Sequence, residues 1–306
     1  MNSADQRQAG ARGRAVTGPG AATPGSPAAG PAPAGGPTGL GRLRLAALLA
    51  LCALLGACST LVQAPARAAS DQPAPTLAQA EQGYARVLLR HVNARGEVDF
   101  AGLRDDPLDS GLLALEHYVR AIADTALDAA PSAPARLAHM INAYNALSMY
   151  NVIASGIPRS HQGWAKVEFF VARKFVIGGS ALSLYAFEND IIRKLGEPRV
   201  HFALNCSARS CPVLPRQPFS AQALEQELER EARDFFARAD SLRIDDARRT
   251  VYLSEMLKFY LADFVPAHAP GLIAYVQRYT SQPIPPDYAV AFIAYDWTIA
   301  NSRAAP

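Results

Sequence analysis

Apolar residues recur at helical spacing near residue 80. Four of them share one face at i, i+3, i+4 and i+7: Tyr84, Val87, Leu88 and His91. This periodicity predicts an amphipathic helix over residues 76–92, and a similar but weaker pattern predicts a second helix near 108–124.

The longest helical pattern begins near Pro134 and ends at Gly156 and Pro158. Proline suits the first turn of a helix, and glycine followed by proline suits its end. Because apolar residues cover more than one face of this segment, we expect a central, buried helix.

The remaining pattern mixes strands with helices. Residues 166–184 are rich in β-branched and aromatic side chains around a Gly-Gly-Ser turn, which predicts a hairpin, and residues 242–254 predict a second. Strands are expected over 199–205 and in the ending 288–300, and helices over 185–195, 220–239 (capped by Ser220), 255–264 and 269–279. The sequence therefore predicts one α+β domain, residues 76–303, with a central buried helix and a small, mainly antiparallel sheet.

The first 75 residues differ in composition from this domain. Residues 1–39 consist mostly of Gly, Pro, Ala, Ser and Thr, so we expect a disordered extension, with an untranslated extension and a start codon nearer Leu40 as the alternative. Residues 40–57 have a basic start and a short apolar run, as in a signal peptide. Leu55-Gly56-Ala57-Cys58 is similar to a bacterial lipobox, which predicts lipidation of Cys58, with residues 58–75 as a flexible tether.

Cleavage at Cys58 would change the charge of the protein. Residues 1–57 hold five arginines and one aspartate, a net charge of +4, whereas the whole chain carries +3, which leaves −1 for the rest. No basic patch indicates nucleic-acid binding. The sequence predicts a protein of the bacterial cell envelope, held by a lipid anchor at the periplasmic side of the membrane. Ser59 after the cysteine favours the outer membrane.

The densest group of reactive side chains lies in "HFALNCSARSCP", residues 201–212. His201 is either a hydrogen-bonded core residue or a general base. Cys206 and Cys211 either form a disulfide, which an oxidising compartment favours, or supply a reactive thiol whose pKa Arg209 or protonated His201 would lower. These three residues are too few for a structural zinc site without a fourth ligand, so no metal or other cofactor is predicted.

Polar residues elsewhere are candidates for substrate contact. Asn142 and Asn145 lie on the central helix, where their amides either tie the helix to neighbouring backbone or polarise a substrate carbonyl. Glu188 and Arg193 are five residues apart, so they do not pair along a helix, and either could orient His201 or bind a polar substrate. Asp263 and Asp296, if buried, need hydrogen-bond donors.

Several segments together resemble a known bacterial family. These are "INAYNALSMYNVI", "KFVIGGSALSL", "FENDIIR", "RVHFALNCSARSCPVL", "KFYLADF" and "YDWTIAN". They resemble the family called domain of unknown function 547, over about Val98 to Asn301. That likeness implies a relation to papain-like and transglutaminase-like folds, in which a nucleophile begins a buried helix and a histidine follows on a strand. The central helix here has Asn142 and Asn145 but no cysteine.

Two functional hypotheses follow from these residues. The first is an envelope hydrolase or acyl- or peptide-transfer enzyme, with His201 as base, Cys206 or Cys211 as nucleophile, and Asn142 or Asn145 polarising the substrate. The second is a non-catalytic lipoprotein that binds a peptide, a glycan or an envelope protein, in which Cys206 and Cys211 form a structural disulfide.

Overall fold

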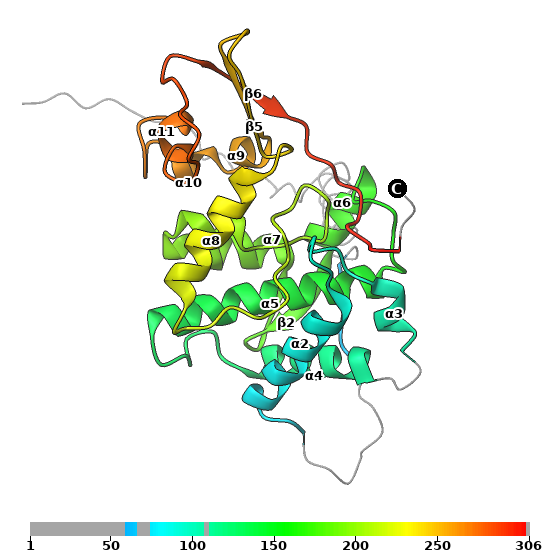
Figure 1. Cartoon of the computed structure of the whole chain (residues 1–306). Helices are drawn as coiled ribbons and strands as arrows, with labels where there is room; N and C mark the ends of the chain where they lie inside the picture. The colour runs from blue at the N-terminus through cyan, green and yellow to red at the C-terminus, as the bar shows by residue number, and fades with distance from the viewer. Residues whose placement is uncertain (1–58, 66–73, 107–109, 304–306) are drawn as a thin grey trace, which may run out of the picture. The chain divides into compact units, whose positions relative to one another are not determined.

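The fold is organised around one long buried helix in the computed structural model, which describes residues 59–65, 74–106 and 110–303 (Figure 1). This helix, α5 (Ala133–Ala154), begins where Ser132 accepts a hydrogen bond from the backbone N–H of Ala135. Every residue from Leu137 to Val152 is buried, which confirms the predicted central helix. The described residues all belong to one compact unit.

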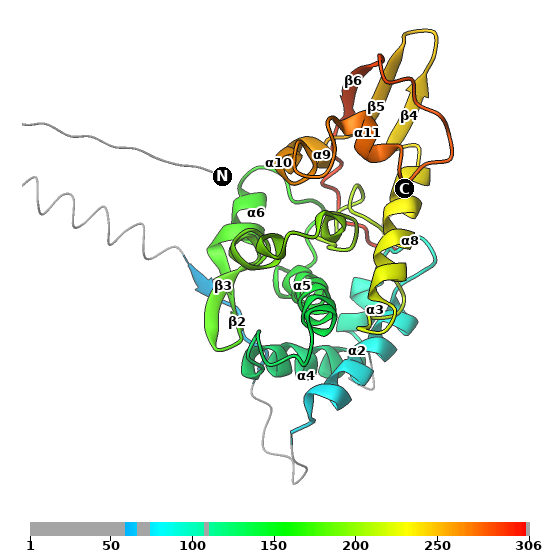
Figure 2. The same cartoon turned by 90° about the vertical axis from the view of Figure 1, so that its left-hand side faces the viewer.

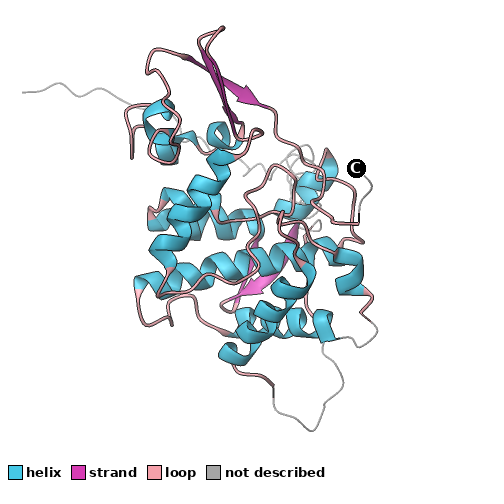
Figure 3. Ribbon diagram, viewed as in Figure 1, coloured by secondary structure: helices cyan, strands magenta, loops and turns pink. Residues whose placement is uncertain are grey.

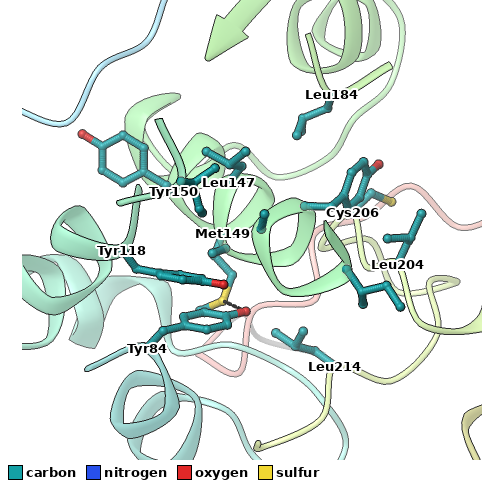
Figure 4. Packing of buried hydrophobic residues seen from close by; sticks show 14 of the residues in the cluster. Tyr84, Tyr118, Leu147, Met149, Tyr150, Leu184, Leu204, Cys206 and Leu214 are labelled. Carbon is teal, nitrogen blue, oxygen red and sulfur yellow. Dashed lines mark hydrogen bonds between the residues drawn. The ribbon is translucent and has the colours of Figure 1, made fainter. Parts of the chain in front are cut away.

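Two amphipathic helices, α2 (Leu77–His91) and α4 (Ser110–Asp124), pack against each other on one side of α5, with the short α3 (Phe100–Arg104) beside them (Figure 2). Thr76 and Gln79 form a capping box at the start of α2. The rings of Tyr84 and Tyr118 stack 4.9 Å apart, and the Tyr84 hydroxyl meets the sulfur of Met149 on α5 (Figure 4). Both helices were predicted from the sequence.

The strands form two small sheets that lie apart in the fold (Figure 3). In the first, β2 (Arg173–Ile177) pairs antiparallel with β3 (Ser180–Ser183) and parallel with β1 (Thr60–Leu61). In the second, β5 (Thr250–Ser254) pairs antiparallel with β4 (Leu242–Asp245) and parallel with β6 (Ala289–Ile293). The α+β class is confirmed, but two mixed sheets replace the predicted single, mainly antiparallel one.

Short helical elements connect these parts. They are α6 (Trp164–Val167), the π-helical turn η1 (Glu168–Ala172), α7 (Leu184–Ala186), the π-helical turn η2 (Phe187–Ile192) and the 3₁₀ turn η3 (Arg193–Leu195). After them come the 3₁₀ turn η4 (Pro198–Phe202), α8 (Leu224–Ala237), α9 (Met256–Phe259), α10 (Leu261–Phe264) and α11 (Leu272–Val276).

Four local predictions differ from the structure. Residues 166–172 are helical rather than extended, and α6 and η1 bury Phe169 while Val167 and Val171 stay exposed. Residues 199–205 are not a strand, since Pro198 begins η4 and Glu197 caps it. The helix at 220–239 starts at Leu224, and the Ser220 hydroxyl accepts a bond from Ala223 in the turn before it. The tether predicted over 58–75 is docked in part, because β1 pairs with β2 and Val62 is buried.

Two apolar cores share the interior. The α5 core comprises the buried side chains of α2, α4, α5, β2 and the loop that carries both cysteines. The aromatic core comprises buried side chains of α8, β4, β5 and α9 to α11, together with Phe202. None of the helices in the described ranges is long and apolar enough to cross a membrane.

Candidate functional site

Two buried amides shape the loop that carries the cysteines. Asn145 on α5 donates to the carbonyl of Ala203 at 3.0 Å and accepts from the N–H of Asn205 at 2.7 Å. Asn205 in turn donates to the carbonyl of Pro212 and accepts from the N–H of Ser207, both at 2.7 Å. The two ends of the loop are thus fixed to each other and to the long helix.

Both cysteines of this loop are free thiols, so of the two alternatives drawn from the sequence the structure contains the free thiols and not the Cys206–Cys211 disulfide. The sulfur of Cys211 accepts a hydrogen bond from the backbone N–H of Cys206 at 3.1 Å and lies 3.1 Å from the Tyr295 hydroxyl. The sulfur of Cys206 lies farther from that hydroxyl, at 3.7 Å. The Cys206 N–H and the Tyr295 hydroxyl therefore both approach the sulfur of Cys211.

These contacts separate the acidities of the two thiols. Burial raises the pKa of Cys211, but hydrogen bonds from Cys206, Tyr295 and nearby backbone groups outweigh it and lower that pKa below its ordinary value. The interaction with Cys211, together with burial, raises the pKa of Cys206 well above its usual range. Cys211 is therefore the thiol whose thiolate the structure stabilises.

A second constellation surrounds His201. Its Nε2 lies 2.7 Å from the Asp263 carboxylate, which also accepts two hydrogen bonds from Arg193, at 2.6 and 2.7 Å. Burial raises the pKa of Asp263, yet the bonds from His201 and Arg193 hold it well below its ordinary value. Asp263 is therefore ionised at neutral pH and fixes the orientation of the imidazole.

Aromatic rings hold the imidazole in place. The His201 ring stacks on Tyr260 with centroids 4.0 Å apart, and Phe264 packs edge-on at 5.3 Å.

The buried Glu188 accepts a hydrogen bond from the Tyr144 hydroxyl at 2.9 Å. Burial, reinforced by Glu188, raises the pKa values of Tyr144 and Tyr260, so both remain protonated donors.

A cavity of about 450 Å³ joins the two constellations. Its wall is largely apolar and includes several aromatic rings, as is usual for pockets that bind small organic molecules. The chemically reactive or charged side chains in its lining are Lys166, Glu188, Arg193, His201, Cys206 and Cys211. Among the described residues, no hydrogen bond links His201 directly to either thiol. The imidazole and the two thiols all line the cavity in which a substrate would lie.

Other residues proposed from the sequence lie elsewhere. The Asn142 amide donates to the carbonyl of Phe219 and accepts from its N–H, both at 2.8 Å, so both its polar atoms are bound to backbone. The exposed Arg209 lines a separate, more polar cavity with Arg95 and Arg238. Cys58 lies outside the described residues. Of the residues considered from the sequence, the structure brings together Glu188, Arg193, His201, Cys206 and Cys211 in the lining of the cavity.

Three residues of the cavity lining were not expected from the sequence: Lys166, Tyr295 and Trp297. Tyr295 and Trp297 flank Asp296, whose own role is local: its carbonyl and N–H bond to the backbone and side chain of Ser210. The "YDW" segment was the available sequence signal, but its aromatic residues, and not Asp296, belong to the site. No group of three or more potential metal ligands occurs within the described ranges.

Comparison with known proteins gives one match. Residues 129–236 match the model of a family described as "Protein of unknown function, DUF547". This segment includes α5, the thiol loop and most of α8, in agreement with the resemblance noted in the sequence. Neither the curated proteins nor the solved structures include a significant match to the chain.

Proposed function

We propose that the cavity is the active site of a thiol-dependent hydrolase or acyl-transfer enzyme, with Cys211 as nucleophile and His201 as the proton-transfer group. The observation that carries the proposal is the environment of the Cys211 sulfur. Two hydrogen-bond donors within 3.1 Å stabilise its thiolate, and the sulfur lines the same cavity as a histidine oriented by Asp263.

The reaction would proceed through a thioester. The Cys211 thiolate attacks a substrate carbonyl carbon, forming a C–S bond while the C=O π electrons move to oxygen. As that oxygen reforms the carbonyl, the leaving group departs and takes a proton from protonated His201. Neutral His201 then removes a proton from water or an acceptor, whose oxygen or nitrogen displaces Cys211. Asp263 keeps the imidazole in one orientation throughout.

The proposed location is the bacterial cell envelope, with the protein anchored to the outer membrane through lipidated Cys58. The apolar run of residues 45–55 and the Leu-Gly-Ala-Cys sequence that ends at Cys58 support this. Replacing Cys58 with serine should abolish incorporation of radiolabelled palmitate, and continued incorporation would refute the proposed anchor.

The two cysteines provide a matched pair for the test of catalysis. Reduced protein is treated briefly with iodoacetamide near neutral pH and mapped by mass spectrometry. Cys211 should be alkylated first, at pH values where an ordinary thiol is still protonated, because its pKa is lowered. Cys211→Ser should also lose the burst of p-nitrophenol from p-nitrophenyl butyrate, whereas Cys206→Ser should keep it.

His201→Gln, which cannot shuttle a proton, should keep alkylation of Cys211 but slow turnover by at least about a hundredfold. Preferential labelling of Cys206, or an undiminished burst in Cys211→Ser, would refute the assignment of Cys211.

A non-catalytic binding protein is the second candidate. The observation that favours it is that His201 makes no hydrogen bond to either thiol among the described residues, since Nε2 is engaged by Asp263. In that case the aromatic cavity would hold a peptide, a glycan or a segment of an envelope protein. It predicts no burst with the ester and equal, slow alkylation of both thiols that follows unfolding.

A further inference from the structure

The first described residues are fixed to the folded domain. Thr60 and Leu61 pair with Arg173 and Lys174 of β2, and the N–H of Val62 donates to the Lys174 carbonyl at 2.7 Å. Val62 is buried in the α5 core. Ser59, the neighbour of Cys58, is therefore held at the edge of the domain rather than on a free tether.

Exposed apolar side chains gather beside this edge. Trp164, Val167 and Val171 lie at i, i+3 and i+7 along α6 and η1, with 71%, 40% and 48% of their surfaces exposed. Leu61 on β1 and Tyr185 on α7 are also exposed, and η1 contacts α7 and β2. We call these five residues the α6–η1 face; Figure 2 shows α6 and β1 on the same side of α5.

This face continues into the rim of the cavity. Val167, Val171 and Tyr185 line both, and the ammonium of Lys166 lies there, 3.6 Å from the ring centre of Trp297. Within the described ranges Lys166 forms no salt bridge. The rim therefore combines apolar and aromatic side chains with a cation that forms no salt bridge among the described residues, the composition of protein surfaces that lie at a lipid headgroup boundary.

We propose that the α6–η1 face docks on a phospholipid bilayer, so that the cavity opens toward the membrane and receives amphiphilic acyl substrates from it. The inference rests on the lipidation and the active site proposed above. The occupant follows from the position of the anchor: Cys58 directly precedes Ser59, and β1 holds Ser59 beside the face. A lipid chain on Cys58 would therefore bring these apolar side chains to the bilayer surface.

The chain contains two tryptophans, and this makes the proposal directly measurable. In the Trp297→Phe variant Trp164 is the remaining tryptophan. This variant is purified from envelope membranes with its anchor and reconstituted in phosphatidylcholine and phosphatidylglycerol vesicles. Phospholipids brominated on the acyl chains should lower Trp164 emission at least about twofold, as expected for a ring at the headgroup–acyl boundary.

Charged substitutions test whether the face itself is responsible. Val171→Asp in the Trp297→Phe background should remove the quenching, whereas Leu89→Asp, at a similarly exposed apolar residue of α2, should leave it unchanged. Emission of Trp164 that is equal in brominated and ordinary vesicles, with the protein still in the vesicle fraction, would overturn the proposal. A face that binds another protein gives that result too.

The measurement separates docking from the proposals on which it rests. Mass spectrometry of the purified chain reports lipidation of Cys58, and the alkylation and burst experiments report Cys211. Quenching therefore tests the face whether or not the thiol is catalytic.

Discussion

Cys206 and Cys211 lie five residues apart on one loop, whereas Arg193, His201 and Asp263 meet from segments up to 70 residues apart. The thiol half of the site belongs to the α5 core, and its shape comes from amides on α5 and within the loop. The acid–base half lies against the aromatic core. Phe202 and Phe264 of this core directly follow His201 and Asp263 in the sequence. The two thiols come from one local loop, whereas the acid–base group is assembled by long-range packing.

This difference predicts how each half fails. The thiol loop should keep its geometry as long as α5 is buried, because amides of α5 and of the loop fix its two ends. His161, Arg238 and the last extended segment bond to the loop as well. The His201–Asp263 pair should be lost with any change that separates η4 from α10, since those elements carry its two members. Substitutions in the two cores can therefore separate the two halves of the site experimentally.

The largest effect is expected for Phe202→Ala in the aromatic core. Phe202 is fully buried, and five aromatic rings surround it with centroids 5.1–6.5 Å away. Removing its ring should lower the free energy of unfolding by about 3–5 kcal/mol, through lost burial and a cavity. Urea denaturation measures this loss.

The matched control is Phe292→Ala, because the ring of Phe292 on β6 is 37% exposed and its removal should lower the free energy of unfolding much less. If the aromatic core supports only the acid–base half, Phe202→Ala should lose turnover while its native state still shows fast alkylation of Cys211. Equal loss of both would contradict the separation of the two halves.

Asn142→Ala should have the next largest effect, now in the α5 core. It would leave the buried N–H and carbonyl of Phe219 without partners, at a cost of about 2–4 kcal/mol in the free energy of unfolding. Gln222→Ala is the control, because Gln222 is exposed nearby and should change stability little. An unchanged midpoint in Asn142→Ala would show that this amide is not a structural clamp.

His161 links the thiol loop to pH. Its Nε2 lies 3.0 Å from the carbonyl of Cys206, and its ring packs on Phe169. Burial, opposed by the bond to the Cys206 carbonyl, lowers the pKa of His161 from 6.5 to about 4. Between these values the unfolded chain binds a proton that the folded chain does not, so acid favours unfolding.

The stability contributed by neutral His161 is therefore complete above pH 6.5 and is lost as pH falls toward about 4, by up to about 3 kcal/mol. Thermal melts of wild type and His161→Gln across this range measure it. The variant should show a shallower pH dependence, and parallel curves would contradict the assigned titration.

The sequence predicted the α5 core better than the aromatic core, for a physical reason. Helices α2, α4 and α5 are long enough for a repeating apolar pattern, and the cysteine loop lies within twelve residues. The aromatic core after α8 consists of short elements such as α9, α10 and α11, each about one turn, where periodicity carries little information.

The candidate site divides in the same way. His201, Cys206 and Cys211 could be predicted because they lie within twelve residues of sequence. Asp263 was noted as an acid that needs donors, but its pairing with His201 depends on how α10 packs against η4. Tyr295 reaches the thiols only through the path of the last extended segment. Such long-range pairings produce no recognisable spacing pattern in a single sequence.

The smallest effect concerns the bridge between η4 and α8. Arg199 on η4 bonds Glu225 at 2.7 and 2.8 Å and Glu197 at 2.8 Å, but the side chain of Glu225 is 79% exposed while that of Glu197 is 24% exposed. Solvent screens an exposed pair, so Glu225→Ala should lower the free energy of unfolding by no more than about 1 kcal/mol, and less in high salt.

Glu197→Ala should cost more, about 1–3 kcal/mol, because its carboxylate also accepts the backbone N–H of Arg199 and begins η4. Urea midpoints of the two variants at low and high salt decide between these costs. If Glu225→Ala were the more damaging change, the contact between η4 and α8, rather than the cap, would position His201, and the acid–base half would depend on a surface ion pair.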